Sequence, residues 1–394
     1  MISVLASVAL FLAVPAGHTL FWIGLVNRAH AIDLGHDNLH RLHKLHNVAI
    51  VGAAVAWFLG AGLFGPRLLR GGSWRDLSGP MAVFAIGCCV VATGWGVCWL
   101  SRRLSPRPRR ILSRVATRRD LEPELSAPAR GVGPYQKLLN VPGNEFLHLE
   151  IVELELRLPR LPAEWDGLSI VHLSDIHLIG TVGLPYFERL FEIANSMNGD
   201  LVAFTGDLLD DPKLVAWLDS TFGKSTAPLG CHFILGNHDR EWGDIAASRK
   251  RLSDLGWNDA SSQTRQLEYR GRTLAIAGTE RPWMGTDPDW SGVPNNAFRL
   301  LLSHTPDQLN RALRDQVDLM LAGHTHGGQV RLPIIGPVYA PSIHGVKYAS
   351  GTFWIDPMLM QVSQGIAGRH PWRWNCPPEL TKLVLRSDQA RNGL

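Results

Sequence analysis

Three long apolar segments dominate the first hundred residues of the chain. No charged residue occurs in 1–27, 45–66 or 77–101. Each run reaches the roughly 20 apolar residues that a helix needs to cross about 30 Å of hydrocarbon. Because short charged loops separate the runs, the pattern favours an all-α membrane module over 1–103 rather than buried core helices. The expected spanning helices cover about 2–26, 47–65 and 80–100.

The first run has an alternative interpretation as a cleaved signal peptide. Ala29-His30-Ala31 has the small-x-small form of a cleavage site. No Lys or Arg precedes the run, however, and its apolar part is longer than a signal peptide needs. We therefore favour a retained span and keep cleavage as the alternative.

Five histidines lie between the first two runs. If this stretch is helical, His36, His40 and His43 share one face, at i, i+4 and i+7. A metal or haem site and an interfacial amphipathic loop are both open interpretations. The lack of carboxylate or cysteine companions at ligand spacing favours the loop. The five histidines are His30, His36, His40, His43 and His46.

The pattern changes from about residue 146. Apolar and charged residues alternate over 152–158, which is the period of a half-buried strand. Short apolar runs bounded by polar turns follow, with helical stretches between several of them, so 146–394 is predicted to be an α/β layered domain. The expected strands are 169–173, 201–204, 232–235, 273–277, 299–302 and 319–321, then 353–355, 360–362 and 381–385. The expected helices are 185–197, 244–255 and 307–314.

Arginine and proline are abundant in 104–145, which we expect to be an unpacked linker. Eight arginines and no acid occur in 101–119. Basic residues beside a span mark its cytoplasmic end, so this predicts a multi-pass protein of the inner or plasma membrane, with a cytoplasmic C-terminal domain and the N-terminus outside. A nucleic-acid-binding tail is the weaker alternative, because the arginines adjoin a span.

Charge and cysteine content exclude several classes of protein. The whole chain has a net charge of +4, but 1–130 holds fifteen Lys/Arg and six acids, so 131–394 is net acidic. A nucleic-acid-binding globular domain is therefore disfavoured. The five cysteines form no C-x-x-C motif, which argues against a disulfide scaffold or a thiolate metal site. We expect Cys231 and Cys376 to be small buried residues.

Five of the predicted strands end in Asp, Asn or His. The carboxyl ends of strands in an α/β sheet form the usual ligand-binding edge, so these side chains are expected to gather there. Short motifs of this kind, taken singly, are more often turns or caps. Five in succession predict a metal site, because burying so many ionisable groups without a cation is costly. The motifs are Asp175-x-His177, Gly206-Asp207-x-x-Asp210, Gly236-Asn237-His238-Asp239, His304 and Gly323-His324-Thr325-His326.

The residue types indicate the chemistry. Carboxylate, imidazole and amide ligands without thiolate suit Mn²⁺, Fe²⁺ or Zn²⁺. Two such ions about 3.5–4 Å apart need a bridging carboxylate and can clamp a phosphoryl group in an in-line displacement. In extended backbone, the paired residues of Asp175-x-His177 and His324-x-His326 would each point the same way.

In this order the motifs resemble those of the calcineurin-like metallophosphoesterases, over about 146–386. The closing Asn375-Cys376-Pro377-Pro378-Glu379 and the three spans are most similar to the membrane-associated branch. That branch includes transmembrane metallophosphoesterase-domain proteins and UDP-2,3-diacylglucosamine pyrophosphatases of lipid A synthesis. The resemblance implies a layered β-sandwich flanked by helices.

The resemblance also implies two divalent metal ions, bound by seven residues. Asp207 would bridge the ions, and a hydroxide between them would be the nucleophile. His238 would be the catalytic histidine and Asp210 the carboxylate that orients it. The first ion would be held by Asp175, His177 and His326, and the second by Asn237, His304 and His324.

Two positions depart from the family pattern. Asp211 stands where phosphoprotein phosphatases have a phosphate-binding Arg, which argues against a phosphoprotein substrate. Gln364 stands where the membrane branch commonly has Arg, so a phosphate contact from that segment is in doubt. His344, Lys347 and Arg369 lie in later loops, and substrate contact and a structural role are both open for them. His172 and His232 lie within predicted strands, where we expect satisfied core residues rather than ligands.

These observations lead to one principal hypothesis. The chain is expected to be a membrane-anchored, dinuclear metal-dependent hydrolase of phosphodiester or pyrophosphate bonds. Its partners would be the lipid bilayer and a phosphorylated, lipid-linked substrate such as UDP-2,3-diacylglucosamine, with no nucleic acid. One alternative is a non-catalytic or regulatory membrane protein that retains the metal-binding fold. Another makes the spans and their histidines the functional part.

Overall fold

The computed structural model describes residues 4–104, 109–261 and 263–388. The chain divides into two compact units, Met1–Pro106 and Arg107–Leu394.

Three long helices make up the first unit, and all three are long and apolar enough to cross a membrane. The predicted helices are thereby confirmed. The first and third pack closely, since a Cβ at Gly17 would lie 1.9 Å from the carbonyl oxygen of Cys88. Small residues allow such an approach between membrane helices. The helices are α1 (Val4–His30), α2 (His36–Trp57), which continues as a π-helical stretch (Phe58–Phe64), and α3 (Gly79–Leu104).

The histidine-rich stretch is helical, so the expectation of a loop was wrong. α2 begins at His36, eleven residues before the predicted start, because the histidines continue the helix ahead of its apolar part. His30 Nε2, at the end of α1, lies 2.6 Å from His43 Nε2 of α2. The polar end of α2 therefore contacts the end of α1 through imidazoles.

Two β-sheets form the centre of the second unit. The first has the strand order β1-β2-β15-β3-β4-β5-β6 and the second β13-β14-β10-β9-β8-β7. The strands of the first sheet are β1 (Ile111–Asp120), β2 (His148–Leu158), β15 (Glu379–Ser387), β3 (Ser169–Leu173), β4 (Leu201–Thr205), β5 (Cys231–Ile234) and β6 (Asn258–Asp259). Those of the second are β13 (Gly351–Ile355), β14 (Met358–Val362), β10 (Leu319–Ala322), β9 (Phe298–Ser303), β8 (Arg272–Thr279) and β7 (Thr264–Tyr269).

Apolar side chains from both sheets fill the space between them. Leu154 and Ile170 of the first sheet belong to one buried cluster with Ile276, Leu300 and Leu321 of the second. Because both faces of the central strands are covered, these strands are continuous apolar runs, as parallel strands in α/β proteins are. The predicted α/β β-sandwich is therefore present.

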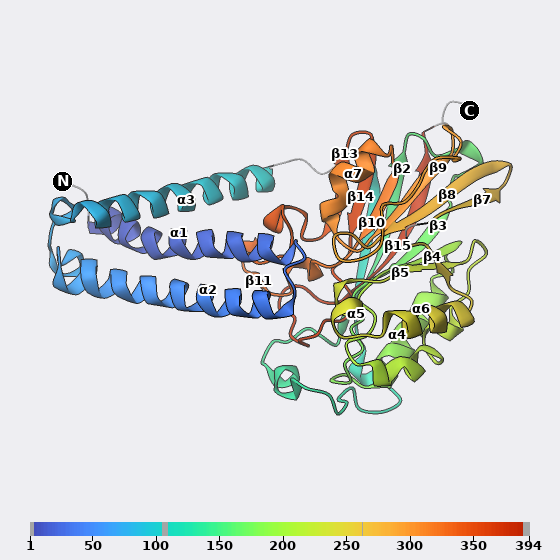
Figure 1. Ribbon diagram of the computed structural model, residues 1–394, viewed down its shortest axis with the longest axis horizontal. Helices are drawn as coiled ribbons and strands as arrows, with labels where there is room; N and C mark the ends of the chain where they lie inside the picture. The colour runs from blue at the N-terminus through green and yellow to red at the C-terminus, as the bar shows by residue number, and fades with distance from the viewer. Residues whose placement is uncertain (1–3, 105–108, 262, 389–394) are drawn as a thin grey trace. The chain divides into compact units, whose positions relative to one another are not determined.

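Helices cover the outer faces of the two sheets (Figure 1). Phe187 and Leu190 of α4 and Leu252 of α6 pack on the first sheet. Leu309 and Ala312 of α7 pack on the second. The helices are α4 (Leu184–Ser196), α5 (Asn237–Glu241), α6 (Ile245–Asp254) and α7 (Leu309–Arg314).

Strands β3, β4 and β5 run parallel in the first sheet, and β8, β9 and β10 run parallel in the second. The carboxyl ends of each set therefore meet at a common edge. The loops that leave these ends carry all seven predicted metal ligands.

The segment expected to be an unpacked linker contains strand β1, which pairs antiparallel with β2. Its arginines contact acids near β2: Arg114 Nη2 lies 3.2 Å from Glu150 Oε2, and Arg118 Nη1 lies 3.0 Å from Glu145 Oε1. The expectation was wrong because an edge strand with solvent-facing basic side chains lacks apolar alternation. The partner acids lie about thirty residues away, where no local pattern can show them.

These ion pairs also weaken the argument, made from the basic residues, that the second unit lies on the cytoplasmic side of the membrane. Part of the basic run is neutralised within the second unit. Arg102 and Arg103 remain in the last turn of α3, directly at the end of the apolar helix. The expected cytoplasmic side of the second unit therefore depends on fewer charges than the sequence indicates.

We predict that the segment before residue 146 is needed for a stable second unit. Leu121, just after β1, is fully buried, and burying one leucine contributes about 2 kcal/mol. A fragment 146–394 should therefore unfold at a temperature about 5 °C or more below that of a fragment 109–394. Thermal denaturation followed by circular dichroism measures the difference. Equal unfolding temperatures and solubility would contradict an integral role for β1.

Candidate metal centre

The structure brings all seven predicted ligands together at one edge of the β-sandwich. Six of them form two groups in which the donor atoms lie within 4.8 Å of one another, and Asp207 belongs to both groups. The seventh, Asn237, lies beside His304 of the second group. The ligands reach this edge from both sheets. Asp175 and His177 follow β3, Asp207 follows β4, Asn237 follows β5, His304 follows β9, and His324 and His326 follow β10.

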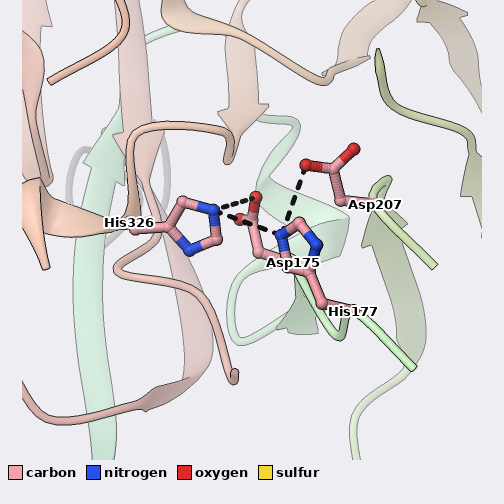
Figure 2. A group of neighbouring side chains, drawn as sticks. All are labelled: Asp175, His177, Asp207 and His326. Carbon is pink, nitrogen blue, oxygen red and sulfur yellow. Dashed lines mark hydrogen bonds and ion pairs between the residues drawn. The ribbon is translucent and has the colours of Figure 1, made fainter. Parts of the chain in front are cut away.

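The first group contains Asp175, His177, Asp207 and His326 (Figure 2). His177 Nε2 lies 3.4 Å from Asp207 Oδ2 and 3.2 Å from His326 Nε2. His326 Nε2 lies 3.7 Å from Asp175 Oδ1. Two carboxylates and two imidazoles therefore surround one small volume.

The second group contains Asp207, His304 and His324, with Asn237 beside them. His304 Nε2 lies 3.1 Å from Asn237 Oδ1 and 3.3 Å from Asp207 Oδ1. The rings of His304 and His324 have centroids 4.9 Å apart. Asp207 thus turns one carboxylate oxygen to each group, which is the geometry that a bridging ligand needs.

Hydrogen bonds behind the ligands set the orientation of the imidazoles. His304 Nδ1–H donates to the carbonyl of Thr205 at 2.7 Å, and His177 Nδ1–H donates to Asp210 Oδ2 at 2.8 Å. Because Nδ1 makes these hydrogen bonds, each ring directs its Nε2 atom to the centre. Partners of this kind are typical of metal-binding histidines.

The backbone at the ligands is left-handed rather than extended. Asp175 and His177 have φ of 56° and 47°, and His324 and His326 have φ of 70° and 49°. The expected strand-like alternation in these two motifs was therefore wrong. Asp207, with φ of 58°, shares the conformation. A left-handed backbone costs a non-glycine residue about 1 kcal/mol or more. Five such residues at one site indicate that the ligand geometry lowers the local stability.

Two glycines allow the loops to approach the ligands closely. A Cβ at Gly236 would lie 2.2 Å from Asp207 Oδ1, and one at Gly323 would lie 2.5 Å from Asp175 Oδ2. Real Cβ atoms do not come this close to an oxygen. Only glycine therefore lets the β5 and β10 loops pass the two carboxylates.

The donor set fits divalent cations. Asp207 Oδ2 is buried and accepts no hydrogen bond, although a buried carboxylate oxygen normally has a partner. The Nε2 atoms of His177 and His326 face each other at 3.2 Å beside this oxygen, as two nitrogen ligands of one cation would. A cation between these three atoms would satisfy all of them, and oxygen and imidazole donors suit borderline to hard ions.

Burial and charge act in opposite directions on the two ligand carboxylates. Burial raises the pKa of Asp175. Burial also favours protonation of Asp207, but the charges of His304 and His238 outweigh it and hold the pKa of Asp207 well below its usual range. Asp207 is therefore the carboxylate that stays ionised between the two groups.

Asp210 joins a ligand to the predicted catalytic histidine. Its Oδ1 accepts a hydrogen bond from His238 Nδ1 at 2.6 Å, while its Oδ2 binds His177. Burial opposes a charge on His238, but Asp210 and Asp207 outweigh it and raise the pKa of His238 to about 10. The side chain of His238 is 22% exposed.

Of the three loop residues left open by the sequence, the structure brings Arg369 to the site. Its Nη1 lies 3.3 Å from Asp210 Oδ1, and its guanidinium stacks 3.9 Å from the ring centroid of Trp242. Lys347 lies over the ring of Tyr348, and His344 contacts the same ring. Arg369 is thus a partly exposed cation beside His238.

Sequence reasoning missed two buried structural residues of the site. Asp239 Oδ1 accepts hydrogen bonds from the backbone of Leu208 and Leu209, and its Oδ2 accepts one from Gly236. It therefore ties the β4 loop to the β5 loop, and its place in the first turn of α5 is a signal that could have found it. Arg373 is fully buried and donates to the carbonyl of His326 at 3.2 Å. No spacing pattern marks Arg373.

Three other predicted positions have structural partners. Gln364 is buried and donates to Glu379 Oε2 at 2.9 Å, so its amide supports the C-terminal strand. His172 bonds to Thr205 Oγ1 at 2.9 Å, and His232 bonds to the carbonyl of Leu229 at 3.0 Å. Both histidines are buried, which confirms their interpretation as core residues.

Comparison with known proteins places this site in a family context. The family model for the calcineurin-like phosphoesterase matches residues 168–328. An uncharacterised metallophosphoesterase of Bacillus subtilis, YkuE, is 30% identical over 248 residues, which cover 61% of this chain and 86% of that protein. A transmembrane protein with metallophosphoesterase domain from Danio rerio is 31% identical over 258 residues, or 60% of this chain and 57% of that protein.

A third relative is named for its reaction. The UDP-2,3-diacylglucosamine pyrophosphatase LpxG of Chlamydia muridarum is 24% identical over 290 residues, which cover 59% of this chain and 88% of that protein. The resemblance stated from the motifs is thereby confirmed, including its membrane-associated relatives.

We predict two divalent ions per chain and loss of both when the shared ligand is removed. In Asp207→Ala each group loses a carboxylate oxygen, so the metal content of the purified full chain should fall below one ion. Elemental analysis by mass spectrometry measures it. Asp211→Asn is the matched control, because Asp211 caps the following turn and belongs to neither group. Retention of two ions by Asp207→Ala would contradict the bridging role.

Proposed function

The chain belongs to the calcineurin-like metallophosphoesterases, and on this premise we propose that it hydrolyses a phosphodiester or pyrophosphate bond at two divalent cations while anchored to a membrane. One observation carries the proposal. Asp207 turns its two buried oxygens to two separate histidine-containing groups, and His238 stands beside them.

In the proposal Asp175, His177 and His326 would hold one cation. A second set would hold the other, and Asp207 would belong to both sets. When bound, the cations supply Lewis-acid polarisation of the phosphoryl group and an attacking water at neutral pH. The second set is Asn237, His304 and His324.

His238 is proposed to donate a proton to the leaving oxygen. Its Nδ1–H is held by Asp210 at 2.6 Å, and its side chain is partly exposed, so Nε2 is the ring nitrogen left for proton transfer. A proton delivered from Nε2 neutralises the leaving oxygen as the bond to phosphorus breaks. Asp210 is a positioning residue, since it holds the ring and balances its charge.

Arg369 is proposed to bind a substrate phosphate oxygen. Asp211 and Gln364 occupy the two positions where the family resemblance would place an arginine, so neither position supplies a guanidinium for phosphate. Arg369 is charged, partly exposed and held beside His238 by Trp242 and Asp210. A guanidinium in this place can form charge-assisted hydrogen bonds to a phosphoryl group.

A lipid-linked substrate, and a cytoplasmic location of the second unit, are parts of the same proposal. Three membrane-length helices precede the catalytic unit, and Arg102 and Arg103 end the last of them. The similarity to LpxG supports a nucleotide-linked lipid such as UDP-2,3-diacylglucosamine. Phosphorus-31 NMR of the products formed from a lipid extract would identify the bond that is cleaved.

For the proton-donor role we predict a loss that depends on the leaving group. With Mn²⁺ and bis-p-nitrophenyl phosphate, His238→Gln should lower kcat by about 100-fold or more. The loss should be larger for a diester with an alkyl leaving group, because an alkoxide needs the proton more than nitrophenolate does.

Steady-state kinetics with both substrates measures these losses, and elemental analysis should show unchanged metal content. His148→Gln, an exposed histidine at the start of β2, is the control and should retain activity. An equal loss with both leaving groups would argue against proton donation by His238.

For the phosphate-binding role we predict an effect on substrate affinity. Arg369→Ala removes a charge-assisted hydrogen bond worth about 1.5 kcal/mol, so KM and the inhibition constant of inorganic phosphate should each rise about tenfold. Arg369→Lys should retain part of the affinity, because it keeps the charge. Arg251→Ala, at an exposed arginine of α6, is the control. A fall in kcat at unchanged KM would show instead that Arg369 acts through Asp210.

A further inference from the structure

The loop that carries His326 continues into a hairpin with an apolar tip. The hairpin consists of β11 (Arg331–Leu332) and β12 (Gly336–Pro337). Between them, the side chain of Ile334 is 76% exposed, and Leu332 and Ile335 are exposed as well. This hairpin therefore offers aliphatic surface to its surroundings close to a predicted metal ligand.

Two exposed tryptophans, Trp372 and Trp374, lie on a segment that hydrogen-bonds to the hairpin. The backbone N–H of Trp374 donates to the carbonyl of Gln329 at 3.1 Å, and the backbone N–H of Arg331 donates to the carbonyl of Trp374 at 2.9 Å. Asn375 Nδ2 also donates to the carbonyl of Arg331 at 3.1 Å. The segment that holds the tryptophans thus lies against the hairpin. We name this surface the apolar rim and define it as Leu332, Ile334, Ile335, Trp372 and Trp374.

The rim lies next to the site. Gln329, three residues after His326, donates from Nε2 to the carbonyl of His370 at 2.5 Å. Arg369, beside His370, reaches Asp210 on the other side. The rim is thus connected to the catalytic edge through a few residues of two loops.

The composition of the rim suits the boundary of a lipid bilayer. Residues 332–343 contain no charged side chain, so placing the tip of the hairpin among lipid headgroups removes no charge from water. Isoleucine and leucine favour the acyl region, while tryptophan favours the headgroup level. Each apolar Å² that leaves water contributes about 25 cal/mol.

The covalent structure keeps the second unit near a membrane. The apolar helix α3 ends at Leu104 and β1 begins at Ile111. Seven residue steps span at most about 25 Å. The second unit is therefore held at a high effective concentration next to whatever bilayer contains α3, which favours a weak apolar contact with that bilayer.

We propose that the apolar rim docks on the bilayer and inserts the tip of the β11–β12 hairpin at the lipid interface. The occupant is the lipid surface of the membrane that holds the helices, rather than a second copy of the chain. The proposed function adds a consequence: a lipid-linked phosphoester would reach His238 with its acyl chains still in the leaflet. The docking itself does not depend on catalysis.

The test uses the full chain in lipid nanodiscs, with exposed Cys98 replaced by serine and a spin label at Ile334→Cys. Power-saturation electron paramagnetic resonance compares the access of oxygen, which enters lipid, with that of a water-soluble nickel chelate. We expect the label at residue 334 to lose access to nickel relative to oxygen. Val115→Cys, at an exposed position of β1, is the matched control and should report water.

A second variant tests whether the rim causes the immersion. Ile335→Asp in the Ile334→Cys chain should return the label to water, because a carboxylate opposes insertion, and the metal content should be unchanged. A water-exposed label in the unmodified rim, or immersion that survives Ile335→Asp, would overturn the proposal. So would dipolar coupling between labels of two copies, or a cross-link from residue 334 to the chain's own helices. No step measures turnover, so failure here is distinguishable from failure of the proposed hydrolysis.

Discussion

The buried carboxylate of Asp207 is the constraint on which the rest of the catalytic unit depends. Both of its oxygens lie away from water, one near His177 of the first sheet and one near His304 of the second. An ionised carboxylate in such a place needs positive charge around it. Histidines in the loops after the strands of both sheets supply this charge, because the carboxyl ends of those strands lie at a common edge. The site therefore forms when the two sheets pack together.

The ligand geometry at this edge requires backbone conformations that these residues do not prefer. Five ligands adopt left-handed backbone, and Gly236 and Gly323 allow contacts that a Cβ would prevent. Buried hydrogen bonds then hold the strained loops: Asp239 joins two of them, and Arg373 holds the carbonyl of His326. Strain of this kind persists only where surrounding interactions determine the conformation.

A single carboxylate links the separate tasks of the site. Asp210 contacts His177 and His238 with its two oxygens and also contacts Arg369. The proposed metal binding, proton donation and phosphate binding would therefore be coupled through Asp210. The same loops lead to the apolar rim, so the proposed membrane contact lies at the same edge of the domain as the site.

The sequence by itself determined the three apolar helices, most of the central strands and the seven residues predicted to be ligands, because these follow from local runs, periods and motif order. It could not determine that Arg114 and Arg118 belong to an edge strand, since their partners Glu150 and Glu145 are distant along the chain. Nor could it show the left-handed ligands, the second contact of Asp210 or the place of Arg369. These depend on which loops meet when two sheets pack, and only tertiary structure decides that.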